Sequence, residues 1–309
     1  MPNRYMLGIL GLSFLLKSTA PIYNVLSLQS PDVIERLKFE NFLLYSMKKH
    51  KIIAKSSISK SEFLILESIR SSNLMVFSPK DIERLMGMER TRCYQLVSRM
   101  KQKGLISEIE NGKYVTITPS PGPDILSVAP YIVFPAYLSF WTALSFHGFT
   151  EQLPLTIFVV TTKRKQKIEH NGMQIRFITL SPSRFFGYLR VDGMIMADKE
   201  KSLIDSLLLP RYAGGMIELA KCLSNAWKEI DVKMLIDYAL RMKNKSLIKR
   251  LGYLTKVLDL PIEPSLIRVL KDNIGRGYSL LDPSGPKGGG YDREWMLREN
   301  ISIEQEAIY

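Results

Sequence analysis

The sequence predicts a protein of the α/β (α+β) class: an N-terminal winged helix-turn-helix domain, then a larger mixed α/β domain with a helical C-terminal part. Residues 78–118 have the pattern helix, helix, hairpin, residues 155–180 contain apolar strand-like runs, and residues 215–271 have helical periodicity. The expected segments are an N-terminal helical extension (1–56), the winged domain (57–118), a linker (119–130) and the larger α/β domain (131–309).

The first helix of the helix-turn-helix pattern is predicted to begin after Ser78. A serine N-cap, a proline at the first helical position and Asp81 three residues after the serine form a capping-box-like start. Gly87 ends this short helix, and a second helix is predicted from Glu89 to Lys103. Four apolar residues with i, i+3, i+4 and i+7 spacing are expected to form its buried face: Cys93, Leu96, Val97 and Met100.

A β-hairpin is predicted directly after the second helix. Two strand-like runs, at residues 105–109 and 113–118, are joined through Asn111-Gly112. Asn-Gly is the strongest short signal for a two-residue hairpin turn, so these runs are expected to form the wing. An apolar helix at residues 63–71 and a short connector at residues 75–77 complete the expected domain.

The exposed face of the second helix is expected to contact DNA. It is polar and cationic and carries no acid, which suits a helix that reads base edges in the major groove. Some winged domains bind protein instead, and that alternative stays open. The DNA-binding residues expected on this helix and on the wing are Arg90, Thr91, Arg92, Gln95, Arg99, Lys101, Lys113 and Tyr114.

The charge of the chain favours a polyanionic partner. The formal net charge is +13, and residues 1–120 contain 18 Lys and Arg against 10 Asp and Glu. The remaining 189 residues contain 25 against 20, so the basic excess is concentrated around the predicted winged domain. Contacts with phosphates and release of counterions would follow from this distribution.

The larger domain is predicted to contain a sheet followed by helices. The run Leu155–Thr162 is continuously apolar and β-branched, as expected for a central strand. Pro210 is expected to end a helix that Asp198 caps. The other expected elements are a helix at 136–147, a cationic turn at 163–167, strands at 173–180, 185–189 and 193–197, four helices over 215–271, and a terminal strand pair at 278–281 and 295–298 around a loop at 284–291.

No catalytic, metal-binding or cofactor-binding residue is predicted. Asp198, Glu200 and Asp205 could hold a divalent cation in a nuclease-like site, but an N-cap, an acidic first helical turn and ion pairs with lysines explain them better. The glycine-rich segment 285–290 lacks the context of a P-loop, and His147 has no partners at triad-like spacing. We therefore expect a protein that is not an enzyme.

The cysteines and the N-terminal residues indicate a cytoplasmic protein. Cys93 and Cys222 lie on apolar helical faces and are expected to be buried thiols in a reducing compartment. The apolar run Met6–Leu16 is too short to span a bilayer, which needs about 20 residues. Residues 32–50 are predicted to form an amphipathic helix.

An ordered series of motifs resembles the AbiEi-type antitoxins of abortive-infection (type IV) toxin–antitoxin systems. The segment Ala143–Thr150 followed by Gln152 is similar to the family's "AL-xx-HG-(L/F)-T-x-Q" signature. The other matching segments follow in order over residues 57–300: Phe185–Gly187, Ala197–Asp205, Pro210 with Gly214-Gly215, Arg250–Leu254, Leu281–Pro283 and Trp295. The extension before residue 57 departs from the family's layout.

The resemblance implies a winged domain followed by an antitoxin domain. It also implies a transcriptional autorepressor that binds inverted repeats in its own promoter, as a homodimer or as two cooperating copies. The functional partner would be a nucleotidyltransferase toxin, counteracted without a stable complex. The alternatives left open are a stand-alone winged-helix regulator and a protein- or RNA-interaction module without a toxin partner, with a metal-dependent nuclease ranked last.

Overall fold

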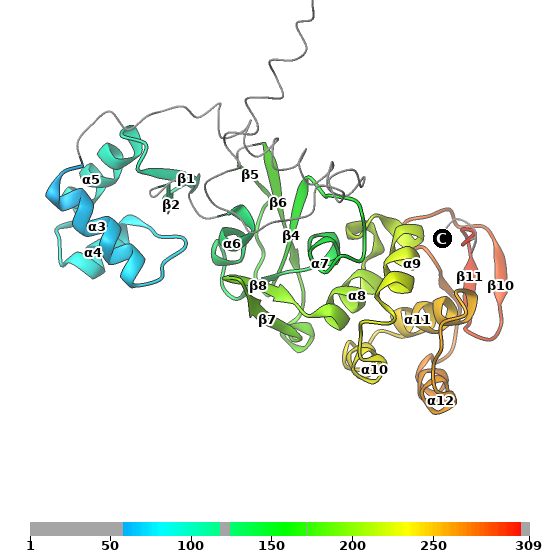
Figure 1. The fold of residues 1–309 in the computed structure, drawn as a ribbon. Coiled ribbons are helices and arrows are strands. Elements are labelled where there is room, and N and C mark those ends of the chain that lie inside the picture. Colours follow the sequence, from blue (N-terminus) through cyan, green and yellow to red (C-terminus); the bar gives the residue numbers. More distant parts are fainter. Residues whose placement is uncertain (1–57, 118–123, 171, 304–309) are drawn as a thin grey trace, which may run out of the picture. The chain divides into compact units, whose positions relative to one another are not determined.

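The computed structural model describes residues 58–117, 124–170 and 172–303 (Figure 1). Within these residues the chain is a mixed α/β protein with several sheets. The predictions for residues 1–56 and for the proline-rich segment 119–123 lie outside the described residues. None of the described helices combines the length and the apolar character needed to cross a lipid bilayer.

Residues 58–117 contain three helices and an antiparallel hairpin. The helices are α3 (Lys60–Ser71), α4 (Pro79–Met86) and α5 (Arg90–Gln102), and the hairpin strands are β1 (Ile106–Glu110) and β2 (Lys113–Thr116). Phe77, which precedes α4, forms a β-bridge with Tyr114. The three helices and the hairpin enclose an apolar core that includes Ile65, Ile69, Phe77, Ile82, Cys93, Leu96, Val97, Met100 and Leu105.

Local features explain where α3 and α4 start and where α4 ends. Ser59 and Glu62 form a capping box at α3, with the Ser59 amide donating to the Glu62 carboxylate over 2.7 Å. At α4 the Asp81 carboxylate accepts from both the amide (2.8 Å) and the hydroxyl (2.7 Å) of Ser78. Gly87 ends α4 with a φ of 61°, a left-handed conformation that glycine adopts without strain.

Residues 124–303 are built on a six-stranded mixed sheet with the strand order β5-β6-β4-β3-β8-β7 (Figure 1). The apolar strand β4 lies between β6, to which it is parallel, and β3, to which it is antiparallel. The strands are β3 (Ala136–Leu138), β4 (Thr156–Thr161), β5 (Ile168–His170), β6 (Met173–Thr179), β7 (Tyr188–Val191) and β8 (Met194–Ala197). The short helices α6 (Ile125–Val128) and η2 (Ala129–Tyr131) precede them, and η3 (Pro182–Arg184) lies between β6 and β7.

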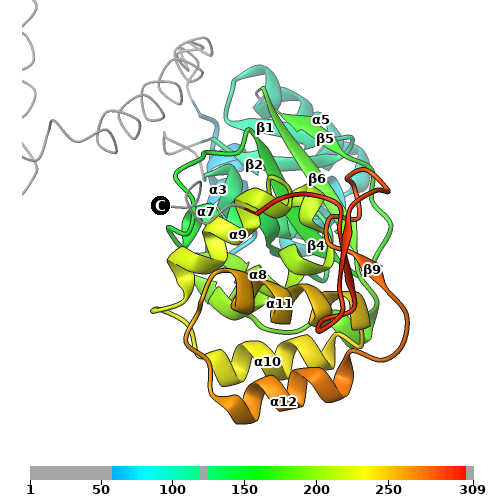
Figure 2. The ribbon, with the colours of Figure 1, turned by 90° about the vertical axis from the view of Figure 1, so that its right-hand side faces the viewer.

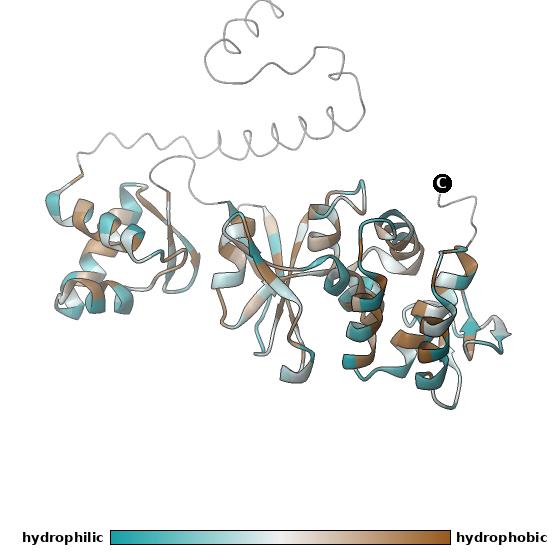
Figure 3. Cartoon of the chain, turned by 60° about the horizontal axis from the view of Figure 1, so that its bottom comes forward, coloured by the Kyte–Doolittle hydropathy of each residue, from teal (hydrophilic) through white to brown (hydrophobic). Residues whose placement is uncertain are grey.

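Helix α8 (Lys199–Leu208) is the centre of the larger core. Every residue from Glu200 to Leu208 is buried, because α8 contacts β8, α7 (Phe140–Phe146), α9 (Gly215–Ala226), α10 (Val232–Arg241) and α11 (Lys245–Val257). Helices α10, α11 and α12 (Pro264–Asn273) pack on one another (Figure 2). Figure 3 shows hydrophobic and hydrophilic residues alternating along the helices of the chain, as expected for amphipathic helices with one buried face. The 3-10 helix η4 (Pro210–Tyr212) joins α8 to α9.

A second, three-stranded sheet packs against α11. Its strands β9 (Ser279–Leu280), β10 (Gly290–Asp292) and β11 (Leu297–Glu299) have the order β10-β11-β9. The β11 strand is antiparallel to β10 and parallel to β9. Trp295, just before β11, is only 2% exposed.

The prediction of one helix over residues 136–147 was wrong at its start. Residues Ala136–Leu138 form β3, which pairs with β4 on one side and β8 on the other, and only Phe140–Phe146 are helical. A short apolar run fits a buried strand and a buried helix equally well, and the pairing with β4 decides between them.

Three smaller differences concern strands. The sequence did not predict β5, and β10 begins within the segment 284–291 that was expected to be a loop. The strand expected at 185–189 lies at Tyr188–Val191 instead. The strands predicted at 155–162 and 173–180, the helix capped by Asp198 and the four helices over 215–271 are confirmed.

Candidate nucleic-acid interface

Helix α5 is anchored by its apolar face and leaves its polar face exposed. Cys93, Leu96, Val97 and Met100 are at most 3% exposed, as their spacing predicts. Arg90, Thr91, Arg92, Gln95 and Arg99, five of the eight residues expected to contact DNA, are all exposed on the other side of the same helix.

The arginines on this face have no acidic partner. Among the described residues, no carboxylate oxygen lies within 4 Å of the guanidinium nitrogens of Arg90, Arg92 or Arg99. Residues 90–102 include no acid, so the exposed side of α5 is a positively charged surface whose charge is not neutralised locally. Such a surface can bind the phosphates of a nucleic acid or an acidic partner.

Tyr94 belongs to the same surface, although it was not among the contact residues expected from the sequence. Its side chain is exposed (46%), and the Arg90 guanidinium lies 5.7 Å from its ring centroid. The i, i+4 spacing of Arg90 and Tyr94 was the available signal, because residues four apart are neighbours on a helix. The ring restricts where the Arg90 guanidinium can lie.

The remaining three expected contact residues all have partners: Lys101 and Lys113 pair with carboxylates of the hairpin, and Tyr114 packs against Phe77. Lys101, at the end of α5, forms an ion pair with Glu108 of β1. The ammonium of Lys113 lies 3.2 Å from a carboxylate oxygen of Glu110. The Tyr114 ring packs at 6.1 Å from Phe77 and is partly buried. These three residues therefore differ from the arginines of α5, for which the described residues supply no carboxylate partner.

The Lys101–Glu108 pair shifts both pKa values. The hydrogen bond between the two side chains raises the pKa of Lys101 and lowers that of Glu108. Glu108 also accepts a hydrogen bond from the amide of Gly112 at 3.1 Å, in the turn of the hairpin. Glu108 thus fixes the turn and the end of α5 together, and it reduces the positive charge offered by Lys101.

Acidic residues of α8 and of its N-cap bond to other parts of the fold, and Asp198 caps the helix as predicted. The Asp198 carboxylate caps α8 by accepting from the amide of Lys201 at 2.7 Å, and it also accepts from the hydroxyl of Tyr238 at 3.0 Å. Glu200 accepts from the amide of Asp231 at 2.7 Å, which ties α8 to the start of α10. Among the described residues, no group of three or more His, Cys, Asp and Glu side chains is placed to hold a metal ion.

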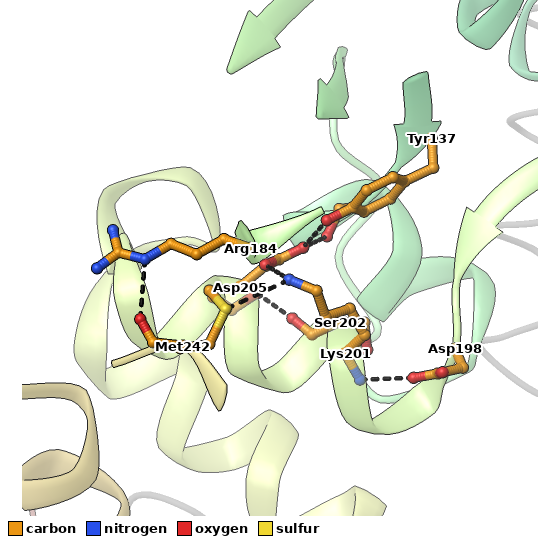
Figure 4. A network of polar contacts seen from close by, with 9 residues as sticks. Tyr137, Arg184, Asp198, Lys201, Ser202, Asp205 and Met242 are labelled. Atoms are coloured by element: carbon orange, nitrogen blue, oxygen red, sulfur yellow. Dashed lines mark hydrogen bonds and ion pairs between the residues drawn. The ribbon is translucent and has the colours of Figure 1, made fainter. Parts of the chain in front are cut away.

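Asp205 and Lys201 form a fully buried polar network with β3 (Figure 4). Asp205 pairs with the ammonium of Lys201 and accepts from the hydroxyls of Tyr137 (2.9 Å) and Ser139 (2.8 Å). All four side chains are 0% exposed. Burial and the neighbouring Asp205 carboxylate raise the pKa of Tyr137 well above its usual range. This fully buried network connects the sheet to α8.

His147 and both cysteines lie in shielded surroundings. The Nε2 atom of His147 lies 2.9 Å from the carbonyl oxygen of Ala197, and burial lowers the pKa of this imidazole. Cys93 and Cys222 are both buried free cysteines, and burial raises the pKa of the Cys222 thiol to about 12. The burial of both thiols confirms the prediction from the sequence.

Comparisons with known proteins give a likeness of fold. The chain is similar to the crystal structure of the RV2827C protein from Mycobacterium tuberculosis. The two share 14% sequence identity and a TM-score of 0.55, over 80% of this chain and 94% of that chain. Since the identity is so low, this likeness shows the fold alone. No family model and no curated protein matches the chain.

Proposed function

We propose that residues 58–117 are a winged helix-turn-helix that binds double-stranded DNA, with α5 in the major groove and the β1–β2 hairpin as the wing. The observation that carries this proposal is the exposed, acid-free side of α5, whose three arginines have no carboxylate partner among the described residues. Arg and Gln side chains pair with guanine and adenine edges, and unpaired cations bind phosphates.

The contact residues fall into two groups by their surroundings. Thr91, Arg92, Gln95 and Arg99 would contact base edges or phosphates, and Arg90 would hold the backbone with its guanidinium beside Tyr94. A second group, Lys101, Lys113 and Tyr114, reaches DNA only by giving up part of its contacts with Glu108, Glu110 and Phe77.

The biological role we propose is that of a cytoplasmic autorepressor and antitoxin-like protein. The AbiEi resemblance supports both parts: binding to inverted repeats in its own promoter, and counteraction of a nucleotidyltransferase toxin. Two copies are expected per operator, because an inverted repeat presents two equivalent half-sites. Co-expression with the neighbouring gene tests the antitoxin part. If that gene arrests growth and the full chain does not relieve the arrest, the antitoxin role is excluded.

The double variant Arg92→Ala with Gln95→Ala is expected to weaken binding to the protein's own upstream DNA and to lose sequence preference. Each lost bidentate base contact costs about 1–3 kcal/mol of discrimination, so a loss of about tenfold or more is expected. A gel-shift titration against upstream and scrambled duplexes measures it. The control is Lys228→Ala with Arg268→Ala, two exposed cations of the larger domain. Unchanged affinity and preference in the α5 variant would exclude this DNA-reading face.

Glu108→Gln is expected to strengthen DNA binding, because it releases Lys101 from its ion pair. An exposed ion pair contributes little because water and salt screen it, which limits the gain to about fivefold. One more phosphate contact would steepen the salt dependence by about one unit. Glutamine keeps an oxygen that can accept from Gly112, so the hairpin turn is retained. Glu263→Gln in the larger domain changes the net charge equally and serves as the control, and an equal gain there would contradict the release of Lys101.

A further inference from the structure

Helix α11 places two lysines, one turn apart, against the loop that connects α12 to β9. Lys249 is 1% exposed, and its ammonium donates a hydrogen bond to the carbonyl oxygen of Gly277. Lys245 is exposed and lies four residues earlier on the helix. A residue and its i+4 neighbour share one face of a helix, so both ammonium groups reach the same loop.

The loop Gly275–Gly277 is shaped to receive these two lysines. A Cβ atom added to Gly275 would lie 2.7 Å from Nζ of Lys245, so a larger residue would displace the ammonium. Gly275 and Gly277 have φ angles of 66° and 82°, which glycine adopts without strain. Arg276, between them, is exposed. Three cationic side chains therefore lie in this region, two on the first turns of α11 and one on the loop.

This cluster has no acidic counterpart. Among the described residues, no carboxylate lies within 4 Å of the cationic nitrogens of Lys245, Lys249 or Arg276. Elsewhere in the same domain the buried Lys201 is paired with Asp205. Burial, and then the charge of Lys245, lower the pKa of Lys249. An anion bound from solution would supply the missing negative charge.

Exposed aromatic rings lie next to this cationic cluster. Tyr278 follows Gly277 in the chain and is 48% exposed, and its ring meets that of Tyr291 edge to face at 4.8 Å. Tyr291 is 56% exposed, and the Arg298 guanidinium lies 5.3 Å from its ring centroid. A hydroxyl contact of 2.8 Å between Ser246 and Ser279 ties α11 to β9 beside the loop. Both rings are thus open to solvent, and Tyr278 directly follows the loop that carries Arg276.

We propose that Lys245 and Arg276 bind phosphates of a single strand of nucleic acid, and that Tyr278 and Tyr291 form the surface on which its bases stack. The buried Lys249 holds the loop in place through the Gly277 carbonyl. Cationic grooves combined with exposed aromatic rings are the usual means of holding an unpaired strand. A duplex fits this site less well, because its bases are already stacked on one another. The site uses none of the residues of α5.

The test uses the full-length protein and fluorescently labelled 20-nucleotide oligo-U and oligo-dT, with binding followed by fluorescence anisotropy over a series of salt concentrations. Lys245→Gln with Arg276→Gln is expected to weaken binding to at least one strand about tenfold. The salt dependence should become shallower by about 1.4 units, since each phosphate contact on a single strand contributes about 0.7. Lys249 is left in place because it is buried. Unaltered binding of both strands by this variant would overturn the proposal.

A second variant separates stacking from charge. Tyr278→Ala with Tyr291→Ala is expected to weaken binding about tenfold while the salt dependence stays the same. Lys228→Gln with Arg268→Gln removes the same charge from the turn after α9 and from α12, and should change neither quantity. An equal loss in that variant would show that net charge alone explains the effect and would overturn the proposed site. The α5 variant Arg92→Ala with Gln95→Ala should keep its affinity for the single strands. If it loses that affinity, the single strand binds at α5 and the α11 site is excluded.

Discussion

Replacing Asp205 with alanine is expected to lower the free energy of unfolding by about 3–5 kcal/mol and the melting temperature by about 10 °C. The substitution leaves the Lys201 ammonium fully buried without its carboxylate, and the hydroxyls of Tyr137 and Ser139 lose their acceptor. Breaking a buried pair from one side costs more than the pair itself contributes, because an uncompensated charge remains. Thermal and urea unfolding followed by circular dichroism measure the loss.

Two further variants test this explanation. Lys201→Met with Asp205→Asn removes both charges and keeps an amide oxygen that can accept from Tyr137 and Ser139, so it is expected to recover most of the lost stability. Asp237→Ala removes a carboxylate from an exposed position on α10 and should change the unfolding free energy by less than about 0.5 kcal/mol. If the double variant is as unstable as Asp205→Ala, the unpaired lysine is not the cause.

Much of the fold could be predicted because its signals are local. The limits of α4 follow from Ser78, Pro79 and Gly87, and the hairpin follows from Asn111-Gly112. The continuous apolar run at β4 is typical of a strand with neighbours on both sides, which it has. In each case, the residues that determine the element lie within it or at its ends.

The features that were missed depend on residues far apart in the sequence. The strand β3 exists because it pairs with β4 and β8, and nothing within Ala136–Leu138 distinguishes it from helix. The expected surface of α5 was exposed as predicted, but the ion pair of Lys101 with Glu108 depends on how the hairpin folds back on the helix. Likewise, only the packing of α11 against the loop after α12 brings Lys245 and Lys249 to Gly275 and Gly277.

Gly252→Ala in α11 is expected to destabilise the protein by about 1–3 kcal/mol, although alanine usually stabilises the interior of a helix by about 0.5–1 kcal/mol. The reason is Trp295, which lies directly against this glycine. A Cβ atom at position 252 would lie 2.1 Å from Cζ3 and 2.4 Å from Cε3 of the indole. Trp295 is 2% exposed, so its ring has little room to move. The backbone amide of Trp295 donates to the Asp292 carboxylate at 2.6 Å, which fixes the main chain there. Urea unfolding monitored by tryptophan fluorescence measures the change.

Gly288→Ala is the matched control, because no atom lies within 4 Å of the position its Cβ would take. It should leave the unfolding midpoint nearly unchanged. Gly252→Ala combined with Trp295→Leu should cost less than the sum of the two single changes, since the smaller side chain leaves space for the added methyl group. The sign of the Gly252→Ala effect is decisive: a higher midpoint would mean that helix propensity outweighs the contact and that Trp295 does not pack on α11 at this glycine. A lower midpoint with coupling to Trp295 would show that the β9–β11 sheet is fixed to α11 through this contact.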